Sequence, residues 1–310
     1  MKAYNKKITL LLPLACAYLG HVIWGLGNIF TKTALEYTGA EAVLAHRFGI
    51  ATILMLLWML IKRRKFSFRG KNFGAVLLLV AMQVLYYVFE TYGIEYTNAS
   101  VSGVVLAVVP VVAMIFAAIF LKEIPTRRQA IFCLLPIAGV IMLTLSASAE
   151  GAIKKPIGIF FLILTCMFSA VYKNANRKAS ETFDSFERSF LVIVASATVF
   201  TVWAALKGDL TVKGFVEPLK EPAYLVSVLV LGLLCSLAAN LLVNFAVSRM
   251  QVVKLSSFGA VSTLVTILSG VVCGEPMTVW IALGAVLILW GVYQVTKPAE
   301  EKKTEDEKNV

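Results

Sequence analysis

The sequence predicts an all-α integral membrane protein in which ten transmembrane helices form two inverted five-helix repeats. Three observations lead to this fold class: apolar stretches of spanning length, a biased placement of basic residues, and a pattern shared by the two halves. Of the 310 residues, 59% are hydrophobic and 15% are charged, whereas charged residues make up about a quarter of an ordinary soluble domain. The composition therefore favours a chain that folds in a bilayer.

Apolar stretches of spanning length recur along the whole chain, and a bilayer core of roughly 30 Å needs about 20 helical residues per crossing. The first stretch lacks the cleavage pattern of a signal peptide, so we expect it to be retained. The predicted spans are residues 9–33, 42–61, 73–93, 100–121, 129–146, 157–174, 189–206, 223–247, 253–273 and 278–296.

Basic residues fix the predicted orientation, because cytoplasmic loops collect Lys and Arg. With both termini inside, 22 of the 29 Lys and Arg residues fall on the inner side and five on the outer side. We therefore expect a multi-pass protein of the cell membrane with both termini cytoplasmic. The net charge of +11 is then explained by the basic residues of the cytoplasmic loops. No nucleic-acid partner is expected.

Cysteine placement and motifs argue against metal and cofactor chemistry. The five cysteines lie in apolar runs without paired spacing or nearby histidines, so neither disulfides nor a metal site is expected. A Gly-rich phosphate loop is absent from the sequence, so direct use of ATP is not expected either. We expect no cofactor.

A repeated turn divides the chain. The segments "FLKEIPTRRQ" and "VCGEPMTVWI" place Glu123 and Glu275 152 positions apart. A unit of five spans re-enters the bilayer from the opposite side when it is duplicated, which inverts the second copy. The predicted units are a first repeat at residues 1–148, a second repeat at 149–297, and a disordered cytoplasmic tail at 298–310.

The beginnings of the two halves share a polar stripe. Shifted by 144 positions, the series His21, Gly25, Asn28 and Lys32 falls on the series Thr165, Ser169, Tyr172 and Asn176. Steps of three or four residues place each series on one face of a helix. A polar face on a membrane helix is expected to face away from lipid.

The stretches "IWGLGNIFTKTAL", "AHRFGIATILML" and "GIEYTNASVSGVVLAVVPVVAMIFAAIFLKEIPTRRQAIFCLLPIAGVIML" resemble the EamA type of the drug/metabolite transporter superfamily. The second half is similar but looser, with Ser262 at the place of Pro110. The resemblance implies ten helices in two inverted repeats. It also implies a central cavity lined mainly by the first, third, fourth, sixth, eighth and ninth spans, and secondary transport of small metabolites.

Glu90 is the main candidate for proton coupling. It lies in the third predicted span on one face with Gln83 and Tyr87, and a carboxyl that holds or releases a proton suits a proton-coupled exporter. The alternative is an ion pair with Arg47 or Lys32, which neutralises an otherwise costly intramembrane charge.

Other intramembrane polar groups leave two interpretations open. His21 is either a proton relay or a hydrogen-bonded packing residue. Lys32 and Lys173 lie near span ends, where snorkelling to the headgroups explains them. Cavity lining and packing remain alternatives for the predicted solute-binding residues, which are Trp24, Asn28, Gln83, Tyr87, Tyr172, Asn240 and Asn244.

The predicted function is secondary active transport of small metabolites such as amino acids, amines or drug-like solutes, as a proton-coupled exporter that works by alternating access. The alternatives are an intramembrane lipid-modifying enzyme, for which no nucleophile, base and metal set is visible, and a non-transporting membrane scaffold. The expected partners are a small solute and the lipid bilayer. The segment from Gly270 to Gly274 also allows a homodimer.

Overall fold

The computed structural model describes residues 2–63, 70–120, 126–132, 134–149, 155–250, 255, 258–275 and 279–296, and these residues form helices and turns without a strand. The helices of the first half are α1 (Lys2–Ala34), α2 (Ala40–Ile61), α3 (Phe73–Tyr96), α4 (Ala99–Leu106), α5 (Val109–Phe120), α6 (Arg127–Phe132) and α7 (Leu134–Ala149).

The second half begins with two long helices and continues in shorter pieces. Its elements are α8 (Ile157–Ala179), α9 (Ser185–Lys207), the short helices η1 (Val212–Val216) and η2 (Glu217–Lys220), α10 (Pro222–Leu229), the π-helix η3 (Val230–Ala238), α11 (Ala239–Val247), α13 (Gly259–Val272) and α14 (Val279–Thr296). The α10, η3 and α11 elements follow one another directly and act as a single span.

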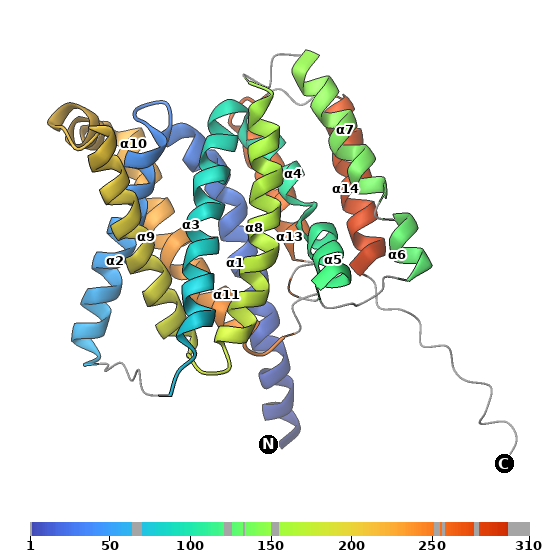
Figure 1. Cartoon of the computed structure of the whole chain (residues 1–310), viewed down its shortest axis with the longest axis horizontal. Coiled ribbons are helices and arrows are strands. Elements are labelled where there is room, and N and C mark those ends of the chain that lie inside the picture. The colour runs from blue at the N-terminus through green and yellow to red at the C-terminus, as the bar shows by residue number, and fades with distance from the viewer. Residues whose placement is uncertain are drawn as a thin grey trace, which may run out of the picture.

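Helices from the two halves alternate in one bundle. Figure 1 shows α2 and α9 at one side and α7 with α14 at the other, with α1, α3 and α8 between them. The closest helix pairs join the halves: α2 with α9, α3 with α8, α7 with α14, α4 with α13, and α1 with both α11 and α13. The bundle is therefore held together by contacts between the halves.

The prediction of an all-α membrane protein is confirmed, whereas the count of ten spans is not. Six described stretches are long and apolar enough to cross a membrane: Leu11–Ala34, Ala40–Ile61, Phe73–Tyr96, Ile157–Ala179, Ser185–Lys207 and Pro222–Val247. Three apolar stretches are shorter: Ala99–Val112, Gly259–Val272 and Val279–Gly291. The predicted span 100–121 appears as two helices, and the predicted tail lies outside the described residues.

The break in the fourth predicted span has a covalent cause. Pro110 has no backbone N–H and occupies the second position of α5, where a proline ring is well tolerated because the first turn needs no donor. The amides of Ala107 and Val108 bond three residues back, to Val104 and Val105, so α4 ends in a tight turn. The regular α-helical hydrogen bonding is therefore interrupted between α4 and α5.

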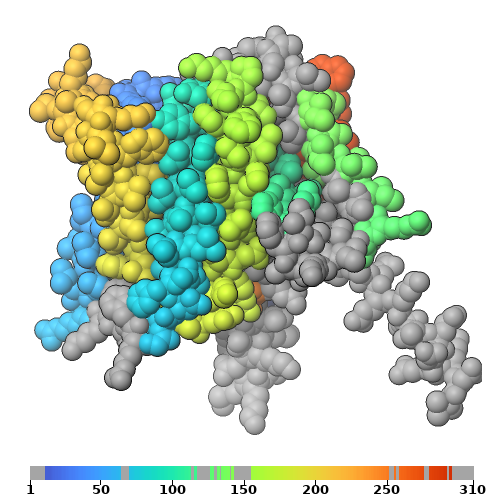
Figure 2. All heavy atoms as spheres, in the orientation of Figure 1, coloured from blue at the N-terminus to red at the C-terminus, as the bar shows by residue number. Residues whose placement is uncertain are grey.

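Many large apolar side chains face outward, and many polar side chains are buried beside the apolar core. Figure 2 shows α3 and α8 side by side on one face. Large apolar side chains of these two helices, including Leu77 on α3 and Phe160 on α8, are exposed. Exposed apolar surface on this scale is unusual for a monomeric soluble protein. Because many polar side chains are buried inside, the bundle suits a bilayer and not water.

Glu275 links the second half to the start of α4. Its two carboxylate oxygens accept hydrogen bonds from the backbone amides of Ala99 (2.9 Å) and Ser100 (2.8 Å). The first amides of a helix have no partner within it and carry the positive end of its dipole, so a carboxylate stabilises them. Glu275, from the second copy of the repeated Glu turn, thus caps a helix of the first half. Glu123, from the first copy, lies outside the described residues.

Two cations bind helix C-termini in the complementary way. Lys32 Nζ donates to the carbonyl oxygens of Thr97 (2.9 Å) and Ile94 (3.3 Å) at the end of α3. Arg177 Nη1 donates to the carbonyl oxygen of Val247 (2.8 Å), the last residue of α11. The C-terminal carbonyls carry the negative end of a helix dipole. Lys32 therefore has partners within the bundle, where the sequence suggested snorkelling.

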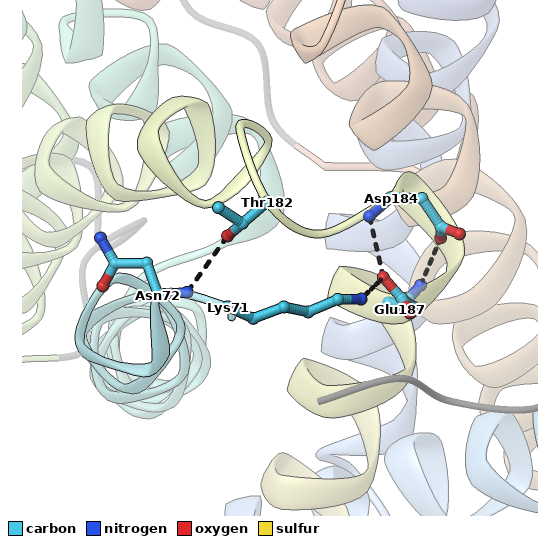
Figure 3. Close-up of polar contacts among 5 residues, drawn as sticks. All are labelled: Lys71, Asn72, Thr182, Asp184 and Glu187. Carbon is cyan, nitrogen blue, oxygen red and sulfur yellow. Dashed lines mark hydrogen bonds and ion pairs between the residues drawn. The ribbon is translucent and has the colours of Figure 1, made fainter. Parts of the chain in front are cut away.

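Ion pairs at the two ends of α9 tie it to the first half. At the lower end Lys71 Nζ lies 2.5 Å from Glu187 Oε2, and the carboxylate of Glu187 also closes the capping box with Asp184 (Figure 3). At the upper end Lys207 pairs with the buried carboxylate of Glu41, which also accepts from the Tyr92 hydroxyl. The position of α9 is thus fixed at both ends.

Removal of the Glu275 cap should loosen the contact between α4 and the second half. We expect Glu275→Ala to lower the free energy of unfolding by about 1–2 kcal/mol, because two amides at a helix N-terminus lose their acceptor. Denaturant unfolding of the purified protein in detergent measures this change. Glu221→Ala is the matched control, since Glu221 precedes α10 without a side-chain cap bond. Equal stability of the two variants would contradict the capping role.

Candidate solute-binding cavity

A cavity lies where the two halves meet. Its volume is about 110 Å³, counted as the space open to the centres of water molecules. One water needs roughly 10–15 Å³ in this measure, so the cavity holds several waters or a small solute. The walls combine aromatic, polar and charged side chains, which is the usual composition of a small-molecule site.

Both halves supply the walls. The first half contributes His21, Trp24, Gly27, Asn28 and Thr31 of α1, Arg47 of α2, Gln83, Tyr86, Tyr87 and Glu90 of α3, Gly103 and Leu106 of α4, and Val109 and Pro110 of α5. The second half contributes Ser169, Tyr172, Lys173 and Asn176 of α8, Val243 and Val247 of α11, Leu255, and Gly259, Ser262 and Thr263 of α13.

Arg47 is the least exposed cation among the described residues of the cavity wall, with only 4% of its surface exposed. Its Nε donates to the Ser236 hydroxyl (2.7 Å) and its Nη2 to the Tyr87 hydroxyl (3.3 Å), while the guanidinium lies over the Tyr87 ring at 4.4 Å from the centroid. Gly232 lets η3 approach α2 closely here, because a Cβ there would lie 2.8 Å from the Ile50 side chain and 3.0 Å from the Arg47 carbonyl oxygen. The cation is therefore held by neutral groups.

Glu90 lies on the same wall and is 6% exposed. Its Oε1 accepts a 2.5 Å hydrogen bond from the hydroxyl of Tyr86, one turn earlier on α3. Within the described part of the chain no ion pair joins Glu90 to Arg47. The carboxylate and the guanidinium thus share one cavity, and each is held by hydroxyl groups.

The α1 candidates lie beside the cavity and also hold α1 in place. Trp24 Nε1 donates to the Cys235 carbonyl oxygen (3.1 Å), and Asn28 Nδ2 donates to the Ser102 hydroxyl (3.2 Å). His21 Nδ1 lies 2.8 Å from the Ala17 carbonyl oxygen of its own helix, and its ring packs against Trp24 and Phe258. The hydrogen bond of His21 therefore stays within α1.

Asn240 and Asn244 are not among the cavity-lining residues. Asn240 Nδ2 donates to the Ser236 carbonyl oxygen of its own span (2.8 Å). Asn244 Nδ2 donates to Ser189 (2.7 Å) and its Oδ1 accepts from Asn176 (2.6 Å). The contacts of Asn244 thus join α8, α9 and α11, as expected for a residue that packs helices together.

The fully buried guanidinium of Arg188 completes this network. It donates to the side chain of Asn176 and to the carbonyl oxygen of Asn244 (2.8 Å). The two carbonyl groups it contacts, those of Asn176 and Asn244, lie in the last turns of α8 and α11. The negative ends of two helix dipoles therefore stabilise this buried cation.

Eight of the ten site residues predicted from the sequence line the cavity, together with residues that were not predicted. Lys173, for which the sequence favoured a position at the headgroups, and Tyr86, which is not among the predicted site residues, both line the cavity. The signal for Lys173 was present in the sequence, because it follows Tyr172 and precedes Asn176 on the polar stripe of α8. Whether any of these residues contacts a solute remains a prediction.

Comparisons with known proteins identify the family. The sequence profile of the EamA-like transporter family matches residues 11–145 and again residues 156–297. The chain belongs to this family and is a multi-pass membrane protein of the transporter class. The first match ends within α7 and the second begins just before α8. Residues from both matches therefore line the cavity.

Relatives support this assignment without naming a substrate. The chain is 32% identical over 89% of its length to the uncharacterized transporter YcxC of Bacillus subtilis, and covers 91% of that protein. It is 23% identical over 88% of its length to an uncharacterized transporter of Archaeoglobus fulgidus, and covers 95% of it. A protein of known crystal structure shares the fold, with a TM-score of 0.67 over 92% of this chain and 96% of that one at 16% identity.

Accessibility of α8 tests the position of the cavity. In a background without native cysteines, we expect a water-soluble thiol reagent to modify the Ser169→Cys variant at least about tenfold faster than Thr165→Cys. The reason is that Ser169 lines the cavity, whereas Thr165 one turn away is fully buried and bonds to the Phe161 carbonyl oxygen. Mass spectrometry of the labelled protein gives the rates. Equal labelling would place the cavity elsewhere.

Proposed function

We propose that this protein is a secondary active exporter of small metabolites, coupled to protons and working by alternating access. The observation that carries the proposal is the shared cavity, because it joins both family matches and holds Arg47 and Glu90 among aromatic side chains. Candidate solutes are amino acids, amines and drug-like molecules. Residues 1–148 and 149–297 are the proposed inverted repeats, with both termini cytoplasmic.

The helix pairs support an inverted relation between the halves. Suppose that α1 corresponds to α8, α3 to α10–α11, and α4 to α13. A two-fold axis that exchanges the halves then turns the pair α1–α11 into the pair α8–α3. It also turns the pair α1–α13 into the pair α8–α4. All four pairs are in contact, as a two-fold relation requires. Rocking of the two halves against each other is the proposed transport motion.

The extent of the cavity supports an inward-facing conformation. Its walls reach Val247 at the end of α11 and Gly259 at the start of α13, the lower end in Figure 1, where α1 also begins. At the upper end the ion pair of Glu41 with Lys207 joins α2 to α9. With cytoplasmic termini, the solute would enter from inside the cell.

Transport itself is tested with the purified protein in liposomes. A solute panel is screened first by thermal unfolding, because a ligand bound only by the folded state stabilises it. Solutes that stabilise the protein are then followed across the liposome membrane under a pH gradient. Flux that rises with the gradient supports a proton-coupled transporter. Stabilisation without any flux would favour a non-transporting scaffold.

If Glu90 couples transport to protons, its replacement should remove the dependence of solute flux on the pH gradient. We expect Glu90→Gln to abolish the dependence of solute flux on the pH gradient between pH 6 and 8, because the amide cannot exchange a proton. The amide oxygen can still accept from Tyr86, so folded yield should be retained. Glu181→Gln, in the exposed turn after α8, is the control. Unchanged pH dependence in Glu90→Gln would remove Glu90 from the coupling step.

A further inference from the structure

A structured segment, residues 208–221, joins the upper ends of α9 and α10. It contains the short helices η1 and η2 and follows α9 at the upper left of Figure 1. The Thr211 hydroxyl accepts a hydrogen bond from the Gly214 amide (3.0 Å) at the start of η1. The Thr38 hydroxyl, in the turn before α2, donates to the Gly214 carbonyl oxygen (2.9 Å). Hydrogen bonds therefore hold the α9–α10 segment against the first half of the chain.

Apolar contacts bind the inner side of this segment to the bundle. The ring centroid of Phe215 lies 3.9 Å from that of His46 on α2. Pro218 is buried, and Leu219 packs against the core cluster that contains Tyr224 of α10. Because its inner side chains are fixed in this way, the segment presents a defined outer surface.

Apolar side chains of the same segment are exposed on that outer surface. Val212 has 67% of its surface exposed, and Leu210 and Val216 are exposed as well. Exposed apolar side chains continue on both flanks, with Leu206 near the end of α9 and Leu225 near the start of α10. Contiguous exposed apolar surface marks an interaction site. Since α9 and α10 belong to membrane spans, the segment continues a surface that faces lipid.

Aromatic residues mark the level of the membrane surface at this end of the bundle. The ring centroids of Tyr92 on α3 and Trp203 on α9 lie 6.1 Å apart, and Lys207 Nζ lies 5.5 Å from the centroid of the Trp203 ring. Trp and Tyr concentrate where the acyl chains meet the headgroups. The α9–α10 segment begins directly after Lys207, so it begins at this level.

The exposed charged side chains of the segment are mixed in sign: Lys213 and Lys220 accompany Glu217 and Glu221. A site specific for anionic lipid typically carries a cluster of roughly four to eight basic residues. Phosphatidylcholine and phosphatidylethanolamine instead present both a phosphate and an ammonium group, which lysines and glutamates can bind by charge-assisted contacts. The charge pattern therefore favours zwitterionic headgroups.

We propose that the α9–α10 segment is an interfacial docking element for zwitterionic phospholipid. In this arrangement Leu210, Val212 and Val216 insert among the upper acyl chains, while Lys213 and Lys220 bind phosphate groups. Amphipathic segments of this kind lie in the plane of the interface and bury their apolar side chains at the headgroup boundary. The occupant is lipid, because the exposed apolar surface is continuous with that of the flanking spans.

Nitroxide labels test the position of the segment in liposomes of phosphatidylcholine. In a background without native cysteines, the label is attached to Val212→Cys of the full chain. Electron paramagnetic resonance measures its collisions with oxygen, which concentrates among acyl chains, and with a water-soluble nickel chelate. We expect collisions with oxygen to dominate, at a depth of about 5–10 Å into the headgroup boundary. Glu181→Cys, in the exposed turn between α8 and α9, is the control and should collide mainly with the chelate.

Three results would overturn the proposal. Dominant collisions with the chelate at position 212 would place the segment in water. Few collisions with either reagent, together with spin–spin broadening, would indicate contact between copies of the chain. Insertion that requires added phosphatidylglycerol would contradict the zwitterionic headgroup.

A second substitution tests the apolar contact. Val216 is exposed, so we expect Val216→Asp to fold and to shift the label at position 212 toward the chelate, because a carboxylate resists transfer out of water. Thr211→Asp is the matched control, since Thr211 is exposed but polar. An equal shift in the two variants would contradict insertion of Val216.

Discussion

Polar groups inside this bundle need partners within the protein, because the hydrocarbon core of a membrane offers no water. The pairs that result connect distant parts of the chain. The carboxylate of Glu275 binds the first amides of α4, and Lys32 and Arg177 bind the last carbonyl oxygens of α3 and α11. Helix ends, where backbone groups lack intrahelical partners, are thus joined across the molecule.

The cavity differs from the rest of the interior in how its charges are held. Elsewhere Glu41 and Glu187 pair directly with lysines at the ends of α9. At the cavity wall Arg47 and Glu90 bind hydroxyl groups of Ser236, Tyr87 and Tyr86. Buried charges without an ionic partner reduce stability, which is a reason to associate them with function.

Irregular helices surround the same cavity. Pro110 divides the fourth predicted span where α4 and α5 meet the cavity wall. In the second half, η3 is a π-helix and carries Ser236, the partner of Arg47. Such interruptions are tolerated in membranes where the freed backbone faces protein or a cavity, and π-helical turns often occur at functional sites. Local backbone geometry and site formation are therefore linked.

The sequence by itself determined the membrane class, the long spans, and the polar faces of the helices; eight of the ten candidate residues on these faces line the cavity. Those features depend on hydrophobic length and on a period of 3.6 residues, which are local properties. Only the tertiary structure decided that Lys32 binds carbonyl oxygens whereas Lys173 faces the cavity. It also decided that Asn244 joins α8 to α9 and α11. Periodicity fixes the direction of a side chain about its own helix axis, whereas its neighbours follow from the packing of the helices around it.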